Sequence, residues 1–402
     1  MNNKKIYMDY AATTPVDQDV LQDMMPYFSE YFSNPSSIHQ FGENAQSGVI
    51  KARRQIADFL GVNLNEILFT SGATEGNNMI IKGIAMSKKI REECGGSPHI
   101  IVSEIEHSCI LESAKRVMKD GLAEVSFIPV DKDGRVSIDT IKSLIRPETA
   151  LISVMYANNE TGVIQPIKKI GTLIAEINAV NKKKIFFHTD AAQAISYLDC
   201  NVNNLGVDML TISAHKIYGP KGVGALYLKR ETPLAKLMDG GRQEFKLRAG
   251  TLNVAGIVGM GSAISKISGH TIKNEEIKKL RDKLIDGIFA SVPHSVLNGD
   301  KEHRLPNNAN ISFEGAEGEA ILVMLSQRGV AVSTGSACAA ENLSPSHVLK
   351  AMGLTDSDTH SSIRFSLGRQ TTEEEVDYVV SIMPGIIAKL RQVSGSLTGN
   401  KQ

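Results

Sequence analysis

Short apolar runs rich in β-branched residues alternate with longer amphipathic stretches through the first two thirds of the chain. Runs of this length, bounded by turn-forming residues, are typical of strands buried on both faces of a sheet. The expected strands lie at 66–70, 99–103, 150–156, 185–189, 208–213 and 224–229. Apolar residues at helical spacing predict helices between some of these strands, at 138–145 and 167–180. This alternation predicts an α/β fold with a mainly parallel sheet.

The last third of the chain has a different pattern, in which strands and helices no longer alternate. It predicts a helix at 275–290 and strands at 310–313 and 362–367. A final helix is expected to begin at the capping box of Thr372 and Glu375 and to run towards Arg391. A helical run of small residues at 253–268 precedes them and is expected to leave the first domain. We therefore expect a large domain over 15–256 and a smaller α+β domain formed by 1–14 and 257–402.

Composition narrows the classes of function. The 402 residues contain 44 Lys and Arg against 44 Asp and Glu, so the formal net charge is zero. A balanced chain offers no electrostatic reason to bind nucleic acid or an anionic membrane. No apolar stretch is long enough to span a bilayer, and the first residues do not resemble a signal peptide. We expect a cytoplasmic protein.

Cysteine spacing points the same way. The chain contains no Cys-x-x-Cys pair, and its four cysteines are widely separated, at Cys94, Cys109, Cys200 and Cys338. This spacing argues against a disulfide framework or a zinc site and favours a reducing compartment. A cysteine with a chemical role is therefore expected to act alone.

Candidate chemistry gathers directly after the expected strands, where ligands bind in open α/β sheets. Small and hydroxyl residues at 71–74 open a helix and could cradle a phosphate, or could be an ordinary helix cap. His107 could stack on a flat ring or carry a proton, although a lone histidine is more often structural. The amides at 158–159 could bond a ligand oxygen or only build a turn.

Two further strand ends carry opposite charges. Asp190 follows one buried strand, and a carboxylate there needs a cationic partner. Lys216 follows the next strand, where burial lowers the basicity of an amine as a Schiff-base lysine requires. An aspartate for a pyridinium nitrogen, a lysine for an aldehyde and a helix start for a phosphate are the supports that pyridoxal phosphate needs. The residues therefore favour this coenzyme.

An ordered series of motifs then extends nearly from end to end, at 7–15, 34–37, 71–75, 158–162, 215–222, 248–251, 335–338 and 362–369. Together these motifs resemble the cysteine desulfurases of the nitrogen-fixation and iron–sulfur-assembly type, in the class-V aminotransferase family. The resemblance implies the fold-type I architecture of pyridoxal-phosphate transferases.

The resemblance also implies a role for individual residues. Lys216 would carry the coenzyme as a Schiff base, Asp190 would hold the pyridinium nitrogen, and His107 would stack on the ring and transfer protons. Asn159 and Gln193 would bond the phenolic oxygen of the coenzyme. The phosphate contacts would come from Ala73, Thr74, Ser213 and His215, with Thr251 contributed by the other subunit.

Substrate contacts follow from the same resemblance. Arg364 would clamp the substrate carboxylate, a role that suits a planar bidentate donor, and Asn34 and Asn159 would also touch the substrate. Cys338 lies among small residues, which favours an accessible thiol over a packed one, and would take the substrate sulfur as a persulfide. No resident metal is expected, although Cys338 could ligate a cluster during transfer.

The implied reaction converts L-cysteine to L-alanine and passes sulfur to a scaffold protein for iron–sulfur cluster or other thio-cofactor synthesis. A homodimer is expected, with no nucleic acid or membrane as partner. The alternatives are a selenocysteine lyase or another fold-type I enzyme, such as an aminotransferase or a kynureninase-like hydrolase, which need no nucleophilic cysteine. A non-catalytic scaffold is a third alternative, and the intact set of Asp190, Lys216, Cys338 and Arg364 argues against it.

One segment departs from the family pattern. The family has a glycine-rich run before 248–251, but this chain has the bulkier Arg242, Phe245 and Lys246 there. We expect this difference to alter the local loop and the dimer contact beside the coenzyme.

Overall fold

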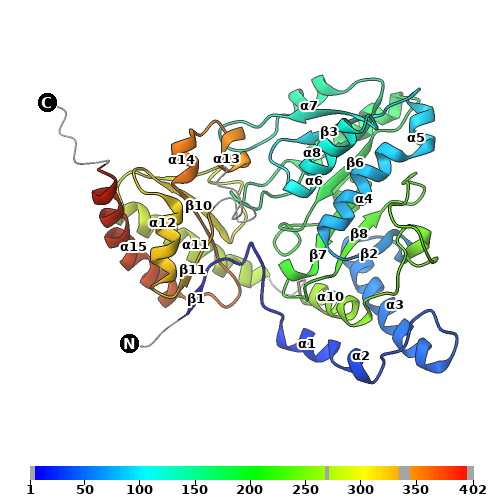
Figure 1. Cartoon of the computed structure of the whole chain (residues 1–402), viewed down its shortest axis with the longest axis horizontal. Helices are drawn as coiled ribbons and strands as arrows, with labels where there is room; N and C mark the ends of the chain where they lie inside the picture. The colour runs from blue at the N-terminus through cyan, green and yellow to red at the C-terminus, as the bar shows by residue number, and fades with distance from the viewer. Residues whose placement is uncertain (1–4, 268–270, 335–344, 396–402) are drawn as a thin grey trace.

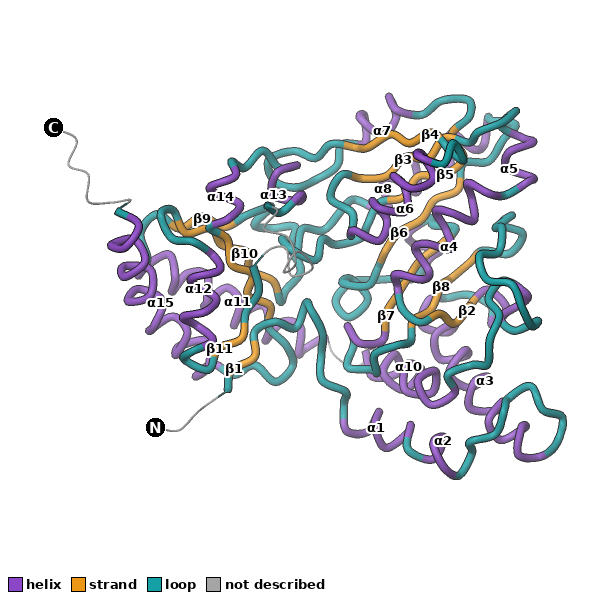
Figure 2. Tube along the Cα trace, in the orientation of Figure 1, coloured by secondary structure: helices purple, strands orange, loops and turns teal. Residues whose placement is uncertain are grey.

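The computed structural model describes residues 5–267, 271–334 and 345–395. Its larger part is built on a seven-stranded sheet (Figures 1 and 2). In spatial order the strands are β2 (Ile67–Thr70), β8 (Gly224–Leu228), β7 (Met209–Ser213), β6 (Phe186–Asp190), β5 (Thr149–Ser153), β3 (His99–Ser103) and β4 (Glu124–Ile128). Strand β8 runs antiparallel to both neighbours, and the other adjacent pairs are parallel. The predicted α/β fold with a mainly parallel sheet is confirmed.

Helices cover both faces of this sheet. The central strands are apolar throughout because successive side chains point to opposite faces. In β3, Ile100 and Val102 face the core under α4 (Ala73–Met86), α5 (Lys88–Glu93) and α6 (Ser108–Lys119), whereas Ile101 faces the opposite core. That opposite core is covered by α1 (Gln18–Met24), α3 (Gln40–Leu60), α8 (Ile167–Val180) and α10 (Val254–Ile267). The shorter helices α2 (Pro26–Ser29), α7 (Ile138–Leu144) and α9 (Val202–Leu205) complete this part.

A second, separate core lies to the left in Figure 1. Its antiparallel sheet contains β9 (Ser295–Leu297), β10 (Asn308–Phe313) and β12 (Ser362–Ser366), and β1 (Ile6–Tyr7) pairs in parallel with β11 (Val330–Ala331). The helices are α11 (Thr271–Ser291), α12 (Gly318–Ser326), α13 (His347–Ala351), α14 (Asp356–His360) and α15 (Glu373–Ser394). The capping box predicted at Thr372 and Glu375 opens α15, with both of its hydrogen bonds present.

The domain boundary predicted after residue 256 falls inside α10. This helix packs closely on α3 and α1, and its apolar residues belong to the core of the larger sheet. The assignment of chain segments to two domains stays a prediction. Within the described part of the chain, no helix combines the length and the apolar character needed to cross a bilayer.

Two features of the sheet could not be predicted from the pattern of apolar residues. Strand β4 is an edge strand whose Glu124 is exposed and whose next three residues are only half-buried, so it lacks a continuous apolar run. The reversal of β8 depends on a tight connection from β7, because the turn at 214–223 is too short for the crossover helix that parallel strands require. The apolar pattern and the length of a single strand indicate neither that β4 lies at the edge of the sheet nor that β8 runs antiparallel.

Candidate active site

The carboxyl ends of β2, β3, β5, β6 and β7 lie at one edge of the sheet, as their relative directions require. The loops that leave these ends carry most of the residues predicted to hold the coenzyme. The chain segment at 9–14 crosses towards the same edge, because Thr14 exchanges hydrogen bonds with His215 and Tyr218 after β7.

Asp190 is the last residue of β6 and is 6% exposed. Its Oδ2 accepts a hydrogen bond from Asn77 Nδ2 at 2.6 Å, and its Oδ1 accepts one from the Ala192 N–H at 2.9 Å. Asn77 is itself fixed, because its Oδ1 accepts from Thr211 Oγ1 at 2.6 Å. Each carboxylate oxygen thus has a donor, which stabilises the negative charge and fixes the plane of the carboxylate.

Lys216 ends a single 3₁₀ turn, Ala214–Lys216, that directly follows β7. Its half-buried ammonium donates to the carbonyl oxygens of Ala11 at 2.6 Å and Ala12 at 2.9 Å. Gln193 Nε2 donates to the same Ala11 oxygen at 2.9 Å. One carbonyl therefore joins two predicted coenzyme residues that come from different strand ends.

His107 is the N-cap of α6, and its Nδ1 accepts from the Cys109 N–H at 3.2 Å. Burial lowers the pKa of its imidazole, the charge of Lys216 lowers it further, and the charge of Asp190 opposes both effects. The ring is therefore neutral near pH 7, with Nδ1 as an acceptor. A neutral flat ring can stack on an aromatic ligand and accept a proton.

The phosphate-cradle candidate is the start of α4, where Ala73 and Thr74 leave backbone N–H groups without helical partners. Ser213 faces this loop, because a Cβ on Gly72 would lie 3.6 Å from Ser213 Oγ. Gly224 permits the close approach of the loop to the sheet, since a Cβ there would lie 2.7 Å from Gly72 Cα. The start of α4 therefore brings backbone N–H donors beside the hydroxyl of Ser213.

His215 follows Ser213 closely, in the turn after β7. Its Nδ1 is 3.2 Å from Thr13 Oγ1. Burial, with smaller contributions from the charges of Lys216 and Lys221, lowers its pKa to about 4. His215 therefore contributes a hydrogen-bonding imidazole to the loop, not a positive charge.

Glu75 links the start of α4 to the motif at 248–251. Its Oε2 accepts from the Ser71 N–H at 2.6 Å, and its Oε1 accepts from Arg248 Nε at 2.9 Å. Burial alone would raise the pKa of this carboxyl, but the hydrogen bonds from Arg248 and Ser71 hold it below the ordinary value. The phosphate-cradle candidate is thus tied to the segment that carries Thr251.

Arg364 projects from β12 and is 2% exposed. One terminal nitrogen donates to Asp9 Oδ1 at 2.8 Å, and the other donates to the Asn159 carbonyl oxygen at 2.9 Å. Its buried Nε has no acceptor among the described residues. A guanidinium that keeps an unsatisfied N–H is suited to a carboxylate ligand.

The two amides of the motif at 158–162 differ in role. Asn158 builds the turn, because its Oδ1 accepts from the N–H groups of Glu160 and Thr161, each at 2.9 Å. Asn158 also holds the preceding loop by donating to the Ile105 carbonyl at 3.0 Å. Asn159 is half-buried beside Arg364, where the predicted coenzyme and substrate roles stay predictions.

Two predicted site residues are not gathered at this edge, and a third lies outside the described chain. Asn34 is exposed, and its Oδ1 accepts from the Ser36 N–H at 2.9 Å. Thr251 is also exposed, and in the described chain neither residue shares a hydrogen bond or ion pair with the groups around Asp190. Cys338 lies outside the described residues.

The segment that departs from the family pattern contains three successive residues with left-handed backbone, Glu244, Phe245 and Lys246, with φ of 39°, 56° and 69°. The buried Glu244 carboxylate pairs with Arg53 at 2.5 Å and accepts from the Phe69 N–H of β2 at 2.7 Å. Arg53 also stacks over the rings of Phe69 and Phe245, at 4.6 and 5.3 Å. The loop is therefore fastened to the strand that leads into the phosphate-cradle candidate.

Two buried acids beside the site were not found from the sequence. Glu106 Oε1 accepts from Ser103 Oγ at 2.5 Å and from the Met155 N–H at 2.6 Å, whereas Oε2 has no partner in the described chain. Burial raises the pKa of Glu106 to about 8 and that of Glu160 to about 7. Either acid could have been suspected only because it adjoins a predicted site residue.

Comparison with known proteins places this site in a family. The model of the class-V aminotransferases matches residues 6–379. The chain belongs to the class-V aminotransferase family. A curated cysteine desulfurase IscS from Clostridium botulinum is 47% identical over 98% of this chain and 96% of its own length. A mitochondrial cysteine desulfurase from Saccharomyces cerevisiae is 44% identical over 97% of this chain and 76% of its own length.

Solved structures agree with this assignment. A NifS-like protein superposes with a TM-score of 0.86 at 35% identity, covering 98% of this chain and all of the other. A structure described as SspA in complex with cysteine has a TM-score of 0.79 at 37% identity, covering 92% of this chain and all of the other. The resemblance to cysteine desulfurases and the fold-type I class are confirmed.

Proposed function

We propose that this chain is a cysteine desulfurase, which converts L-cysteine to L-alanine and takes the released sulfur onto Cys338 as a persulfide. The observation that carries the proposal is the arrangement of Asp190, Lys216 and Arg364 about one sheet edge, in a chain 47% identical to a curated cysteine desulfurase. Arg364 supplies the carboxylate recognition that any α-amino acid substrate needs.

We propose pyridoxal phosphate as the coenzyme, and three features of the site fit it. The Asp190 carboxylate, which accepts a hydrogen bond on each oxygen, suits a pyridinium N–H, and the half-buried amine of Lys216 suits an aldehyde. The hydroxyl and N–H donors around Gly72 suit a phosphate. The chemistry that the coenzyme supplies when bound is an electron sink for charge that develops at the substrate Cα.

The remaining roles belong to side chains of the chain itself. Arg364 orients the substrate carboxylate, and its links to Asp9 and Asn159 hold the guanidinium plane. His107, neutral because of burial, accepts and returns a proton beside the ring position. The Lys216 amine, once free, is the second group at this edge able to move a proton.

Sulfur transfer is assigned to Cys338. Its thiolate attacks the substrate sulfur, the bond between that sulfur and Cβ breaks, and its electron pair stays with the carbon skeleton. Protons added at the carbon skeleton complete alanine, while the new sulfur–sulfur bond leaves a persulfide on Cys338. An acceptor thiol of a scaffold protein then takes the sulfur for iron–sulfur cluster or other thio-cofactor synthesis.

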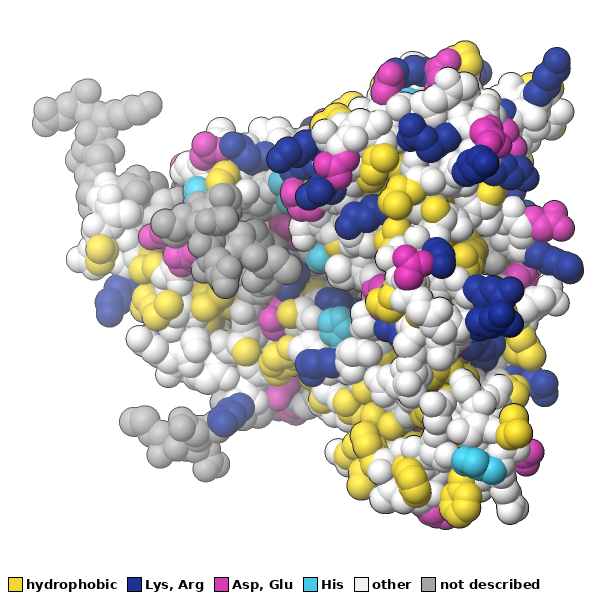
Figure 3. All heavy atoms as spheres, turned by 45° about the vertical axis from the view of Figure 1, so that its right-hand side comes forward, with side chains coloured by type: hydrophobic (Ala, Val, Ile, Leu, Met, Phe, Trp, Pro, Cys, Tyr) yellow, Lys and Arg dark blue, Asp and Glu magenta, His cyan; other side chains and the backbone are white. Residues whose placement is uncertain are grey.

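We also propose a homodimer in which Thr251 completes the phosphate site of the partner. Thr251 is exposed, as this role requires. Large exposed apolar side chains gather over α2 and the start of α3, as the lower part of Figure 3 shows, and include Met25, Phe28, Phe32, Ile38, Phe41 and Ile50. An apolar patch of this kind on a protein surface marks an interaction site.

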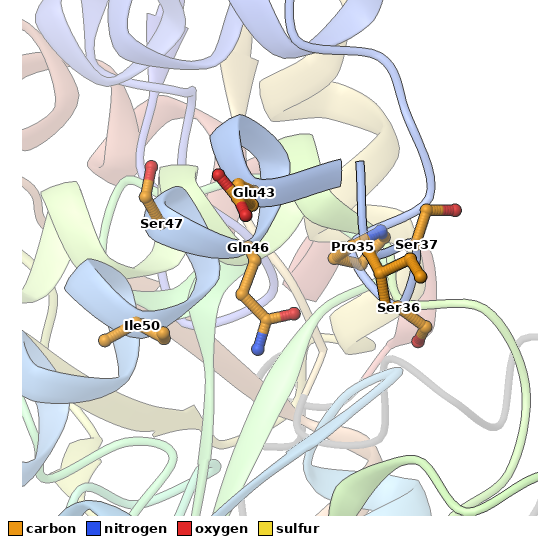
Figure 4. Close-up of a pocket in the computed structure, with 8 residues that line it drawn as sticks. Pro35, Ser36, Ser37, Glu43, Gln46, Ser47 and Ile50 are labelled. Carbon is orange, nitrogen blue, oxygen red and sulfur yellow. The ribbon is translucent and has the colours of Figure 1, made fainter. Parts of the chain in front are cut away.

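A shallow pocket adjoins these apolar side chains. It has a volume of about 330 Å³ and lies between the segment at 35–38 and the face of α3 that carries Glu43, Gln46 and Ile50 (Figure 4). A second copy of the chain that covered the patch would also close this pocket. Asn34 lies in the same segment, so its predicted substrate role is proposed to depend on the dimer.

The test is to purify the protein with its coenzyme, add L-cysteine and a thiol reductant, and measure alanine and sulfide. The wild type should form both in equal amounts, and Cys338→Ala should lose sulfide release while keeping the coenzyme absorbance. Cys94→Ser is the matched control, because Cys94 follows α5 near the amino ends of the strands and should leave the rate unchanged. Equal rates for the wild type and Cys338→Ala would refute the proposal.

A further inference from the structure

The start of α13 makes two polar contacts with loops at the edge of the larger sheet. Ser346, the N-cap of α13, is 4% exposed, and its Oγ donates to Glu160 Oε2 at 2.5 Å. The same oxygen accepts from the Leu349 N–H at 3.1 Å, as an N-cap side chain should. One hydroxyl therefore both caps the helix and binds a buried acid that is 186 residues distant in the sequence.

The next residue makes the second contact. His347 Nε2 lies 2.9 Å from the carbonyl oxygen of Glu106. Because a carbonyl oxygen only accepts, Nε2 carries the hydrogen of this bond. His347 is an exposed residue, but partial loss of solvent around its ring is the chief cause that lowers the pKa of its imidazole, so the ring donates as a neutral imidazole.

The two partners adjoin predicted site residues. Glu106 immediately precedes His107, and Glu160 immediately follows Asn159. The loops are also joined to each other, because Asn158 Nδ2 donates to the Ile105 carbonyl at 3.0 Å. Ser346 and His347 thus bind a pair of linked loops that carry His107 and Asn159.

Apolar packing reinforces the contact. Five buried side chains form a small cluster separate from the two main cores: Ile105, Met155, Val348, Leu349 and Met352. Ile105 and Met155 lie in the loops after β3 and β5, and the other three come from α13 and the residue after it. The buried bond from Ser346 to Glu160 therefore lies beside a dry contact, where a lost hydrogen bond is not readily replaced by water.

We propose that Ser346 and His347 are positioning residues of the site: they hold the loops of His107 and Asn159 in register with each other and with α13. The inference rests on the proposed function for its effect on turnover, but not for its effect on the loops. Because Ser346 is the N-cap of α13, these contacts also fix where α13 begins relative to the site.

The first test uses the coenzyme-free protein and is independent of activity. Hydrogen exchange of backbone amides at 104–107 and 158–162 should quicken at least about tenfold in Ser346→Ala, because the buried Glu160 carboxyl loses its donor. Ser346→Thr retains a hydroxyl and should exchange as the wild type does. Thr355→Ala removes the exposed N-cap hydroxyl of α14 and is the matched control, with no change expected in either loop.

The second test uses the coenzyme-loaded protein. Ser346→Ala and His347→Leu should each lower kcat about tenfold with a smaller change in KM, and should alter the circular dichroism of the bound coenzyme. His347→Gln, which can still donate through its amide, should recover most of the rate. Unaltered exchange and dichroism in both Ser346→Ala and His347→Leu would overturn the inference.

The outcomes separate this inference from the proposed function. If the wild type forms no alanine from cysteine, the proposed function fails, and the exchange and dichroism results still decide the role of Ser346 and His347. If Ser346→Ala does not fold, the comparison of His347→Gln with His347→Leu, together with Ser346→Thr, tests the same role. Recovery by neither conservative variant would contradict a role through hydrogen bonding.

Discussion

Asp190 and Glu106 are buried carboxyls at the ends of neighbouring parts of one sheet, but their surroundings differ. Asp190 has a donor on each oxygen, from Asn77 and from Ala192. Glu106 has two donors on Oε1 and none on Oε2 among the described residues, and burial raises its pKa to about 8. The placement of donors, more than depth of burial, decides which acid can hold a charge for a cationic ligand.

Glu244 adds a third arrangement. It is as deeply buried as Asp190, but it is neutralised within the chain by Arg53. Its charge is therefore neutralised by a partner within the chain, whereas the hydrogen bonds that Asp190 accepts from Asn77 and Ala192 come from neutral donors. The comparison supports the ligand-binding role proposed for Asp190, and it indicates a stabilising role for Glu244 and a protonated supporting role for Glu106.

The largest effect is expected from Asp190→Asn. The substitution keeps the shape of the side chain and removes the charge proposed to face the pyridinium nitrogen, so kcat/KM for L-cysteine should fall about 100-fold or more. Steady-state kinetics with titrated coenzyme measure this. Asp139→Asn, at an exposed position in α7, should match the wild type. If Asp190→Asn lowered kcat/KM no more than Asp139→Asn does, the contrast drawn between Asp190 and the other buried acids would be wrong.

Arg53→Ala should be the most destabilising of the supporting changes. It leaves the buried Glu244 charge without its partner, which costs about 3–5 kcal/mol when a buried pair is broken on one side. Urea unfolding of the coenzyme-free protein measures this. The adjacent exposed Arg54→Ala should change stability by less than about 0.5 kcal/mol. Equal stability of the two variants would show that Glu244 does not depend on Arg53.

Glu106→Leu should destabilise the protein less, by about 2 kcal/mol, because it orphans the Ser103 hydroxyl and the Met155 N–H. Glu106→Gln keeps an acceptor for both donors and imitates a protonated acid, so it should remain within about 1 kcal/mol of the wild type. If Glu106→Gln were as harmful as Glu106→Leu, the carboxyl would have to be ionised in the folded protein.

The last effect is a gradual one, a pH dependence of stability. A carboxyl with its pKa raised from 4.5 to about 8 binds a proton in the folded state that the unfolded chain has lost. Glu106 should therefore make stability fall as pH rises from about 5 to about 8, by up to about 1 kcal/mol per pH unit. Glu106→Gln should remove this slope, and a wild-type slope that persisted in the variant would exclude Glu106 as its source.

The elements that position the site were largely predictable from sequence because they depend on local patterns. Apolar runs predicted the central strands. Because parallel strands have their carboxyl ends at one edge of the sheet, Asp190 and Lys216 were expected to lie at the same edge. Asn77 was missed because nothing in a helical Asn indicates a bond to a carboxylate 113 residues away. Glu244 was missed similarly, since its partners Arg53 and Phe69 lie far back in the chain.

The roles proposed for Thr251 and Asn34 would require a second copy of the chain, so neither the sequence nor the fold of one chain tests them. The bulkier residues at 242–246 illustrate a different limit. They departed from the expected pattern, yet the exposed Phe245 stacks on Arg53 and the left-handed backbone holds Glu244 in place. The comparison with the family pattern showed that the residues differ, but it could not predict the contact between Phe245 and Arg53 that accommodates them.

The most direct test of the central claim is to locate sulfur after one turnover. The coenzyme-loaded protein is mixed with L-cysteine without reductant, alkylated, digested and mapped by mass spectrometry. One additional sulfur atom on Cys338, matched by one alanine released, is the predicted result. Alanine released without sulfur on Cys338, or sulfur found on Cys94, Cys109 or Cys200 instead, would contradict it.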